Sequence, residues 1–151
     1  MSAFAKDLET GHEFESRLLK FIQRRYPTAT RIASAFSDYD IFIAETGKTI
    51  ECKYDKKASE TGNLFIEIKS SDNQSGILTS KADYYYIDTG IKLYCIPLNK
   101  IFECLLIECI KPENFSVNQG AFEMEMTGHL VPLKIFEKYC IQILPTLMDL
   151  H

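Results

Sequence analysis

The sequence predicts one domain, residues 1–151, in which helices and strands combine in an α/β or α+β arrangement. The chain has 151 residues and 46% of them are hydrophobic, which suits one globular domain with a substantial core. A stretch of helical periodicity comes first, and short apolar runs separated by turn residues come after it. No repeat, low-complexity segment or linker divides the chain. We therefore expect a helix followed by a mainly antiparallel set of strands.

The first predicted helix spans residues 11–27, where apolar side chains recur at helical spacing until Pro27. Short apolar runs between turn residues predict strands at 29–36, 40–44, 48–54, 63–70, 83–98 (a pair turning at Thr89 and Gly90) and 122–126. Residues 56–62 are expected to form a polar loop, and residues 71–82 combine turn residues with a short helix. Periodicity predicts further helices at 99–110 and 131–144.

The charge balance excludes a protein that coats nucleic acid through bulk positive charge. Lys and Arg number 17 against 21 Asp and Glu, which gives a net charge of -4 and a pI near 5.4. An anionic partner would have to be met by a local patch or through a metal ion. The local exception is residues 16–37, which hold Arg17, Lys20, Arg24, Arg25 and Arg31 and no acidic residue.

The five cysteines form no CxxC motif and lie mostly in apolar runs. An odd number without metal-ligand spacing indicates reduced, buried thiols in a cytoplasmic protein. Cys104 and Cys109 are expected to pack within an apolar helix. No apolar run approaches the roughly 20 residues that span a bilayer, so we expect a soluble protein with no membrane association.

Residues 38–55 (DYDIFIAETGKTIECKYD) predict a β-hairpin with unexpected charges. A turn centred on Thr46 and Gly47 would set Phe42 opposite Glu51 and Asp40 opposite Lys53. Alternation then places Asp38, Asp40, Phe42, Glu51 and Lys53 on one face, and Ile41, Ile43, Ile50 and Cys52 on the other. Asp40 and Glu51 become diagonal neighbours, with Cβ atoms under about 8 Å apart.

Two carboxylates at that separation predict a divalent-metal site, and Lys53 adds a cation within reach of an anion bound there. The alternative is an ion pair between Asp40 and Lys53 on a solvated sheet face, with Glu51 merely exposed. The hairpin alone leaves both open.

A further carboxylate comes from the first helix. At about 100° per residue, Glu15 falls within the apolar stripe of Phe14, Leu18 and Ile22, whereas Glu13 falls on the solvent side. An ionised carboxylate facing a core is costly unless it is paired or binds a metal. The alternative is a glutamate at the edge of the stripe whose carboxylate reaches solvent.

The same projection separates the basic residues of this helix. Arg17, Lys20 and Arg24 point away from Glu15 and form a solvated face, and only Arg25 borders the apolar side. The adjacent tyrosines at 84–86 alternate faces in a strand, so at most two of them share a side on which bases could stack.

These residues resemble the PD-(D/E)XK nuclease superfamily, which includes type II restriction endonucleases, archaeal-type Holliday junction resolvases and phage exonucleases. The resemblance rests on the helix sequence GHEFE, on Asp40 at the start of DIFIA, and on the Glu-x-Lys of ECK in the next strand. Residues 62–87 are similar to the segment after the Glu-x-Lys strand in some phage and bacterial members. The chain departs from the pattern in having Tyr39, and no Pro, before the acidic residue.

The resemblance implies a restriction-endonuclease-like fold, an α/β core with a central mixed β-sheet flanked by helices. It implies that Asp40 and Glu51 hold Mg or Mn, with the backbone carbonyl of Cys52 as a further ligand. Lys53 would orient the attacking water or stabilise charge on the scissile phosphate. Glu15 would act on the metal through a water or help to hold a second metal.

The resemblance leaves some roles open. Asp38 competes with Asp40 as the metal ligand because both lie on the same face. Arg25, Gln74 and Lys81 are candidates for contacts to nucleic acid. The implied activity is metal-dependent endonucleolytic hydrolysis of DNA, structure-specific for branched or junction DNA in recombination or repair, with a homodimer left open. The alternative is a catalytically inactive nuclease-fold module that binds nucleic acid or a protein partner.

Overall fold

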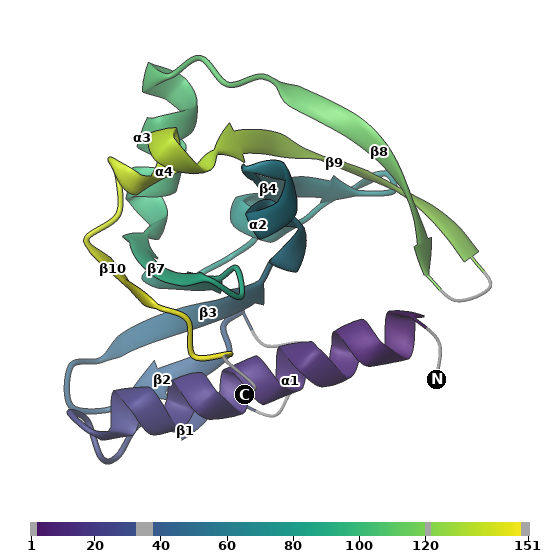
Figure 1. Ribbon diagram of the computed structural model, residues 1–151. Coiled ribbons are helices and arrows are strands. Elements are labelled where there is room, and N and C mark those ends of the chain that lie inside the picture. The colour runs from purple at the N-terminus through teal and green to yellow at the C-terminus, as the bar shows by residue number, and fades with distance from the viewer. Residues whose placement is uncertain (1–2, 33–37, 120–121, 149–151) are drawn as a thin grey trace.

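The computed structural model describes residues 3–32, 38–119 and 122–148. A long helix, α1 (Ala3–Gln23), lies along one face of a six-stranded sheet, and a second, four-stranded sheet lies on the other side of that sheet (Figure 1). The fold is therefore α/β with a mixed central sheet flanked by helices.

The central sheet has the strand order β1-β2-β3-β6-β7-β10. Its strands are β1 (Thr30–Arg31), β2 (Ile41–Ile43), β3 (Lys48–Tyr54), β6 (Tyr84–Asp88), β7 (Lys92–Pro97) and β10 (Gln142–Pro145). Neighbours are antiparallel except β3 and β6, which are parallel with Glu51 beside Tyr85 and Lys53 beside Ile87. The expected mainly antiparallel strand set thus contains one parallel pair at its centre.

The second sheet has the order β5-β4-β9-β8 and is antiparallel throughout. Its strands are β4 (Asn63–Ser70), β5 (Asn73–Gln74), β8 (Pro112–Gln119) and β9 (Phe122–Pro132). The remaining helices are α2 (Lys56–Thr61), the 3-10 helix η1 (Gly76–Leu78), α3 (Leu98–Ile107) and α4 (Leu133–Glu137). β8 and β9 extend together beyond the rest of the molecule at the right of Figure 1.

Strand alternation divides the core into two clusters, one on each face of the central sheet. On the α1 face, Phe14, Leu18 and Ile22 are buried against Ile41 and Ile50. The other cluster is shared between both sheets and α3, and includes Leu64, Ile66, Tyr85, Ile87, Ile96, Ile101 and Val131. Tyr84 and Tyr86 pack toward α1 while Tyr85 packs toward the second sheet, as the alternation predicts.

The first helix has different ends from those predicted from its periodicity. α1 begins at Ala3 and ends at Gln23, before Pro27. The chain leaves the helix through backbone hydrogen bonds from Arg25 and Tyr26 to the Ile22 carbonyl, and the Gln23 side chain donates to the Ala29 carbonyl at 2.9 Å. These bonds close the helix one turn early because the residue before a proline disfavours helical backbone.

Residues 56–62 are not a polar loop but contain α2, which polar composition alone concealed. Asp55 accepts a hydrogen bond from the Ala58 N–H at 3.2 Å, and Gly62 ends the helix in the left-handed region at φ 81°. Both are ordinary capping signals, and the second needs glycine because a Cβ disfavours that backbone.

The C-terminal third also differs from expectation. Residues 131–144 complete β9 at Pro132 and form only the short α4 before the chain becomes extended as β10, which pairs with β7. β8 was not predicted, although it pairs with β9 over its whole length. The predicted strand at 29–36 is seen as β1 alone, since residues 33–37 lie outside the described residues. β5 was not predicted, and β9 continues to Pro132, six residues beyond the predicted strand at 122–126. The remaining strands and α3 lie close to their predicted positions.

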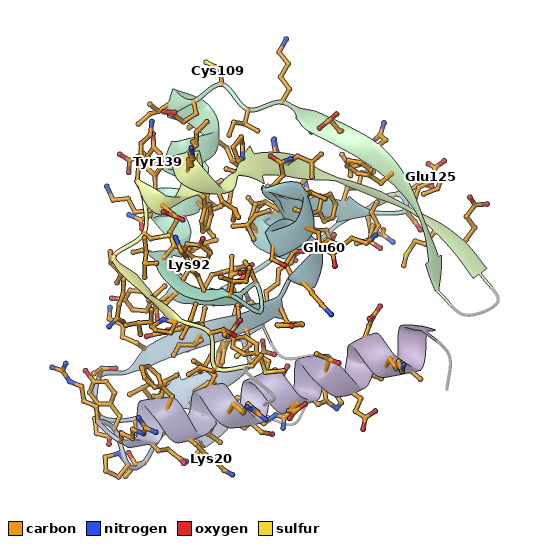
Figure 2. The ribbon with its side chains drawn as sticks, viewed as in Figure 1. Lys20, Glu60, Lys92, Cys109, Glu125 and Tyr139 are labelled. Atoms are coloured by element: carbon orange, nitrogen blue, oxygen red, sulfur yellow. The ribbon has the colours of Figure 1, made fainter. Side chains whose placement is uncertain are left out.

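All five cysteines are free, as expected, but they are not uniformly buried. Cys95 and Cys104 are buried, whereas Cys109 is exposed. The prediction that Cys109 packs within a helix is wrong: α3 ends at Ile107, and Cys109 follows with a left-handed backbone (φ 52°), at the upper end of the molecule in Figure 2. Within the described residues, no helix has the length and apolar character needed to cross a bilayer.

Candidate functional site

The hairpin of β2 and β3 has a register two residues away from the predicted one. Ile41 pairs with Ile50 and Phe42 with Thr49, because the turn occupies residues 44–47 and is not centred on Thr46 and Gly47. A shift of two residues keeps every side chain on its predicted face. It also moves Asp40 from the position opposite Lys53 to a position beside Glu51.

The Asp40 side chain accepts a backbone hydrogen bond from β3 beyond the point where β2 pairs with that strand. Ladder pairing between the two strands ends at Ile41 and Ile50, and the Asp40 carboxylate accepts a hydrogen bond from the Cys52 N–H at 2.8 Å. The N–H and C=O of one strand residue point toward the same neighbouring strand, so the Cys52 carbonyl is directed toward Asp40 as well. The Cys52 side chain faces the α1 core, as predicted.

Asp40 and Glu51 form a coupled pair of carboxyl groups. Burial and the neighbouring charges of Asp40 and Glu15 raise the pKa of Glu51 to about 8, so the two carboxyl groups favour a state in which one of them holds a proton. Burial also raises the pKa of Asp40, against the Cys52 N–H, which lowers it. The pair is therefore short of positive charge.

Glu15 lies near this pair but has a partner of its own. It is half-buried on α1 and forms an ion pair with Arg31 of β1, whose guanidinium also contacts the Ser16 hydroxyl. Its charge still acts on Asp40 and Glu51, raising both pKa values. Neither alternative for Glu15 anticipated this arginine, which offsets the cost of placing a carboxylate at the edge of the core.

Lys53 is held on the same face of β3 as Glu51. Its ammonium donates to the Phe65 carbonyl at 2.8 Å and lies over the Phe65 ring, 5.5 Å from the centroid. Burial lowers the Lys53 pKa, and the charges of Asp55, Glu67 and Glu51 counter that effect. The predicted alternative of a cross-strand pair between Asp40 and Lys53 is not formed.

A pocket of about 320 Å³ opens between β3 and the second sheet, and Asp38, Glu51 and Lys53 of the hairpin face line it, while Asp40 lies outside its lining. Its walls include Asp38, Glu51, Lys53, Glu67, Ser80 and Tyr85. Burial raises and Ser80 lowers the Tyr85 pKa, and burial dominates, so the pKa of Tyr85 is about 12. The pocket thus presents carboxylates, an ammonium and hydroxyl groups to a common space.

The side chains at this pocket supply only part of the ligand set that a cation such as Mg²⁺ needs. In the part of the chain that the structure describes, no group of three or more His, Cys, Asp or Glu side chains is arranged to hold a metal ion. Mg²⁺ is often held by one or two carboxylates, with waters and substrate oxygens completing its shell. Asp40, Glu51 and the Cys52 carbonyl provide such an incomplete set, and their shortage of positive charge favours a cation.

Other predicted site residues lie at the margin or elsewhere. Asp38 is exposed on the pocket wall and forms an ion pair with Lys81 at 3.5 Å, so each of these two residues already has a partner. Gln74 is exposed on β5 and pairs with Lys69 at the edge of the second sheet. Arg25 lies beyond the end of α1, over the Tyr26 ring, on the opposite face of the central sheet from Glu51.

Three residues of the site were missed in the sequence. Arg31 was seen only as part of a basic segment, while Glu67 and Phe65 come from β4 and reach the site only because the second sheet packs against β3. Glu67 accepts from the Ser75 hydroxyl at 2.6 Å. The alternation of NLFIEIKS places Phe65 and Glu67 on one face of β4, but no local signal relates that face to β3.

The fold and pocket define an α/β protein with an acidic pair and a lysine on one sheet face. Comparison of the chain with protein-family models, with curated proteins and with solved structures finds no match.

Proposed function

We propose that this chain is a metal-dependent DNA endonuclease with a restriction-endonuclease-like fold. The observation that supports the proposal most is the position of Asp40 beside Glu51, where burial and the charge of Asp40 raise the pKa of Glu51 so that it keeps a proton. Lys53 lines the same pocket. A divalent cation there would replace that proton and meet the oxygens of a phosphodiester.

Asp40, Glu51 and the Cys52 carbonyl would hold Mg or Mn, which when bound lowers the pKa of water and polarises a phosphoryl oxygen. Lys53 has three N–H donors, and the bond to the Phe65 carbonyl uses one of them. The others can donate to a phosphate oxygen as charge builds on it. Such stabilisation is a large part of phosphoryl-transfer catalysis.

The substrate class we propose is branched or junction DNA, as the resemblance of the hairpin motif implies. Asp38 on the pocket wall and its ion-pair partner Lys81, together with Gln74 on β5, would lie along the path of a strand that enters the pocket. Glu15 would act from α1 through a water. Each of these assignments is separable from the metal chemistry by mutation.

The test incubates the purified protein with supercoiled, linear, single-stranded, flap and four-way-junction DNA in Mg, Mn or EDTA. We expect cleavage that needs the metal and is fastest on a branched substrate. Asp40→Asn and Glu51→Gln should each abolish it while the circular dichroism spectrum stays unchanged. Equal cleavage by wild type and both variants would show that a contaminant or another site is responsible.

A second candidate function is a nuclease-fold module without catalysis that binds nucleic acid or a protein. It is favoured by the bond from Lys53 to the Phe65 carbonyl and by the pairing of Glu15 with Arg31, which engage two of the four predicted catalytic side chains. Metal-independent binding of junction DNA without cleavage in Mg or Mn would select this alternative.

A further inference from the structure

A second pocket lies on the face of the central sheet opposite to Glu51 and Lys53. It has a volume of about 540 Å³, which is in the range of small-molecule sites. It opens where α1 ends and leaves the sheet uncovered, between the β2–β3 turn and β10. Its lining includes three cations, Arg24, Arg25 and Lys48, and three tyrosines, Tyr26, Tyr84 and Tyr86.

The cations at the pocket are exposed and none is neutralised by an acidic residue. No ion pair is found for Arg24, Arg25 or Lys48 within the described residues, and the lining contains no Asp or Glu. The carboxylate of Glu45 in the adjacent turn is bound by the backbone and hydroxyl of Thr28. In a chain of net charge -4, three unpaired cations around one cavity single it out for an anion.

Each guanidinium is placed by an aromatic ring. Arg24 lies over Phe21 at 6.0 Å and Arg25 over Tyr26 at 5.5 Å from the ring centroids. Stacking of this kind limits the side-chain freedom of an arginine while its N–H donors stay available. The rim of the pocket therefore offers partly ordered donors, which suit a phosphate group.

The floor of the pocket is aromatic and fixed to the sheet. Tyr84 and Tyr86 are two apart on β6 and so face the same side, where both pack against the core cluster on the α1 face. Aromatic side chains of this kind bind nucleobases by stacking, at about 1–3 kcal/mol per base. A phosphate alone would make no contact with these aromatic rings, and an apolar ligand would make no ionic contact with the cations.

We propose that this pocket binds a nucleotide, with the base against Tyr84 and Tyr86 and the phosphate at Arg24, Arg25 and Lys48. The nucleotide is either free or one unit of a single strand, since both present the same base and phosphate. The site shares no residue with the pocket of Glu51 and Lys53, so it stands whether or not the chain cleaves DNA.

The experiment is isothermal titration calorimetry in EDTA with ADP, adenosine, inorganic phosphate and an eight-residue deoxyadenosine strand. ADP or the strand should bind, and adenosine and phosphate should each bind at least about tenfold more weakly, because each lacks one half of the recognised group. Tighter binding of the strand than of ADP would identify the ligand as nucleic acid, and tighter binding of ADP would identify it as a free nucleotide.

The decisive variants change exposed side chains and so leave the fold intact. The double change Arg24→Gln and Arg25→Gln, and separately Lys48→Gln, should weaken binding at least about fivefold. Lys20→Gln is the matched control, since Lys20 points from α1 away from the sheet (Figure 2). Glu51→Gln should bind the nucleotide as wild type does, whatever its effect on cleavage.

Three results would overturn the proposal. The first is the absence of heat for both ADP and the strand at about 5 mM ligand, since that limits the affinity to a level without specificity. The second is an equal loss in the Lys20→Gln control and in the double arginine variant, which would indicate bulk charge. The third is a dimer in sedimentation velocity that Ile141→Asp dissociates, because the pocket would then be an interface between copies.

Discussion

Glu51 makes the stability of the protein depend on pH in a direction opposite to that of most carboxylates. Its pKa is about 8 in the folded chain against an ordinary value of 4.5, so between these limits the native state holds a proton that the unfolded state has lost. The free energy of unfolding should therefore fall as pH rises through this window, and level off above it.

The measurement is urea denaturation of wild type and Glu51→Gln in EDTA from pH 4 to 9. The variant cannot ionise, so its stability relative to wild type should rise steadily from about pH 5 to 8. Subtraction removes the titration of the shared groups that are not coupled to Glu51. A difference that stays constant with pH would show that Glu51 has an ordinary pKa and that its contact with Asp40 is not formed.

Substitution of Lys53 distinguishes a role in stabilising the transition state from a role in binding DNA. If its free N–H donors act mainly on the charge that builds on the phosphate, Lys53→Ala should lower cleavage by about 100-fold or more while DNA affinity stays within a few-fold. The two are measured by single-turnover cleavage in Mg and by fluorescence anisotropy in Ca. Equal losses of rate and affinity would make Lys53 a phosphate anchor.

Glu15 and Glu13 form an unusually well-matched pair of test positions on α1. Each carboxylate has an arginine partner, Arg31 for Glu15 and Arg17 for Glu13, so replacement by Gln removes one ion pair in either case. Only Glu15 contributes to the raised pKa values of Asp40 and Glu51. A difference between the two variants therefore reports proximity to the acidic pair.

We expect Mg or Mn to raise the melting temperature of wild type and of Glu13→Gln alike, through ligand linkage. The rise should be smaller in Glu15→Gln, because that variant has less negative charge near the metal site. Metal-dependent cleavage should fall in Glu15→Gln alone. A cleavage defect confined to Glu13→Gln would mean that the wrong face of α1 has been assigned to the site.

At the scale of elements, the turn that leads from β3 through α2 into β4 positions Lys53. Asp55 caps α2 by accepting from the Ala58 N–H, and its second oxygen accepts from the Phe65 N–H at 3.1 Å. The same residue Phe65 receives the Lys53 ammonium on its carbonyl. One carboxylate thus fixes both the helix start and the strand that orients the lysine.

Asp55→Ala should cost about 1–2 kcal/mol of unfolding free energy, because a helix cap and a second backbone N–H lose their acceptor. Cleavage at saturating DNA should fall as well, since the Phe65 carbonyl loses its support. Glu60→Ala is the control on the same helix, as Glu60 is exposed on α2 (Figure 2). Equal thermal melting of the two variants would contradict the capping role.

The η1 segment can approach β4 only because it begins with glycine. A Cβ at Gly76 would lie 2.0 Å from the Glu67 carbonyl oxygen, and the backbone there is left-handed at φ 56°. This close contact brings Ile77 into the core and lets η1 form the wall of the pocket facing β3. The pocket is therefore built between elements and not within the hairpin that carries the acidic pair.

At the scale of the whole molecule, the two sheets share a core. Ile66 of β4 is 2% exposed and belongs to the same cluster as Ile87 of β6, Ile101 of α3 and Val131 of β9. Because both sheets contribute to this one buried cluster, we expect them to unfold together in one transition. A single unfolding transition is the result that the predicted single domain requires.

Ile66→Ala should lower the free energy of unfolding by about 2–5 kcal/mol, through lost burial and the cavity left behind. Near-ultraviolet and far-ultraviolet circular dichroism should follow the same urea curve. Leu106→Ala, at a leucine 78% exposed on α3, should change stability by under about 0.5 kcal/mol. Two separated transitions would show that the sheets are independent units.

The sequence by itself determined which side chains share a face. Side-chain alternation has a period of two, so Asp40, Glu51 and Lys53 stay together even though the hairpin register is two residues from the predicted one. Helical periodicity placed Phe14, Leu18 and Ile22 in the core for the same reason. Local geometry fixes these relations whatever the rest of the chain does.

Only the tertiary structure decided what faces that surface. The Arg31 partner of Glu15, the Phe65 carbonyl that holds Lys53, and the wall formed by Glu67 and η1 all come from elements that reach the site by long-range packing. Periodicity carries no information about which sheet covers which face. The raised pKa of Glu51 has the same origin, because burial and neighbouring charge arise from the packing of separate elements and not from the residue itself.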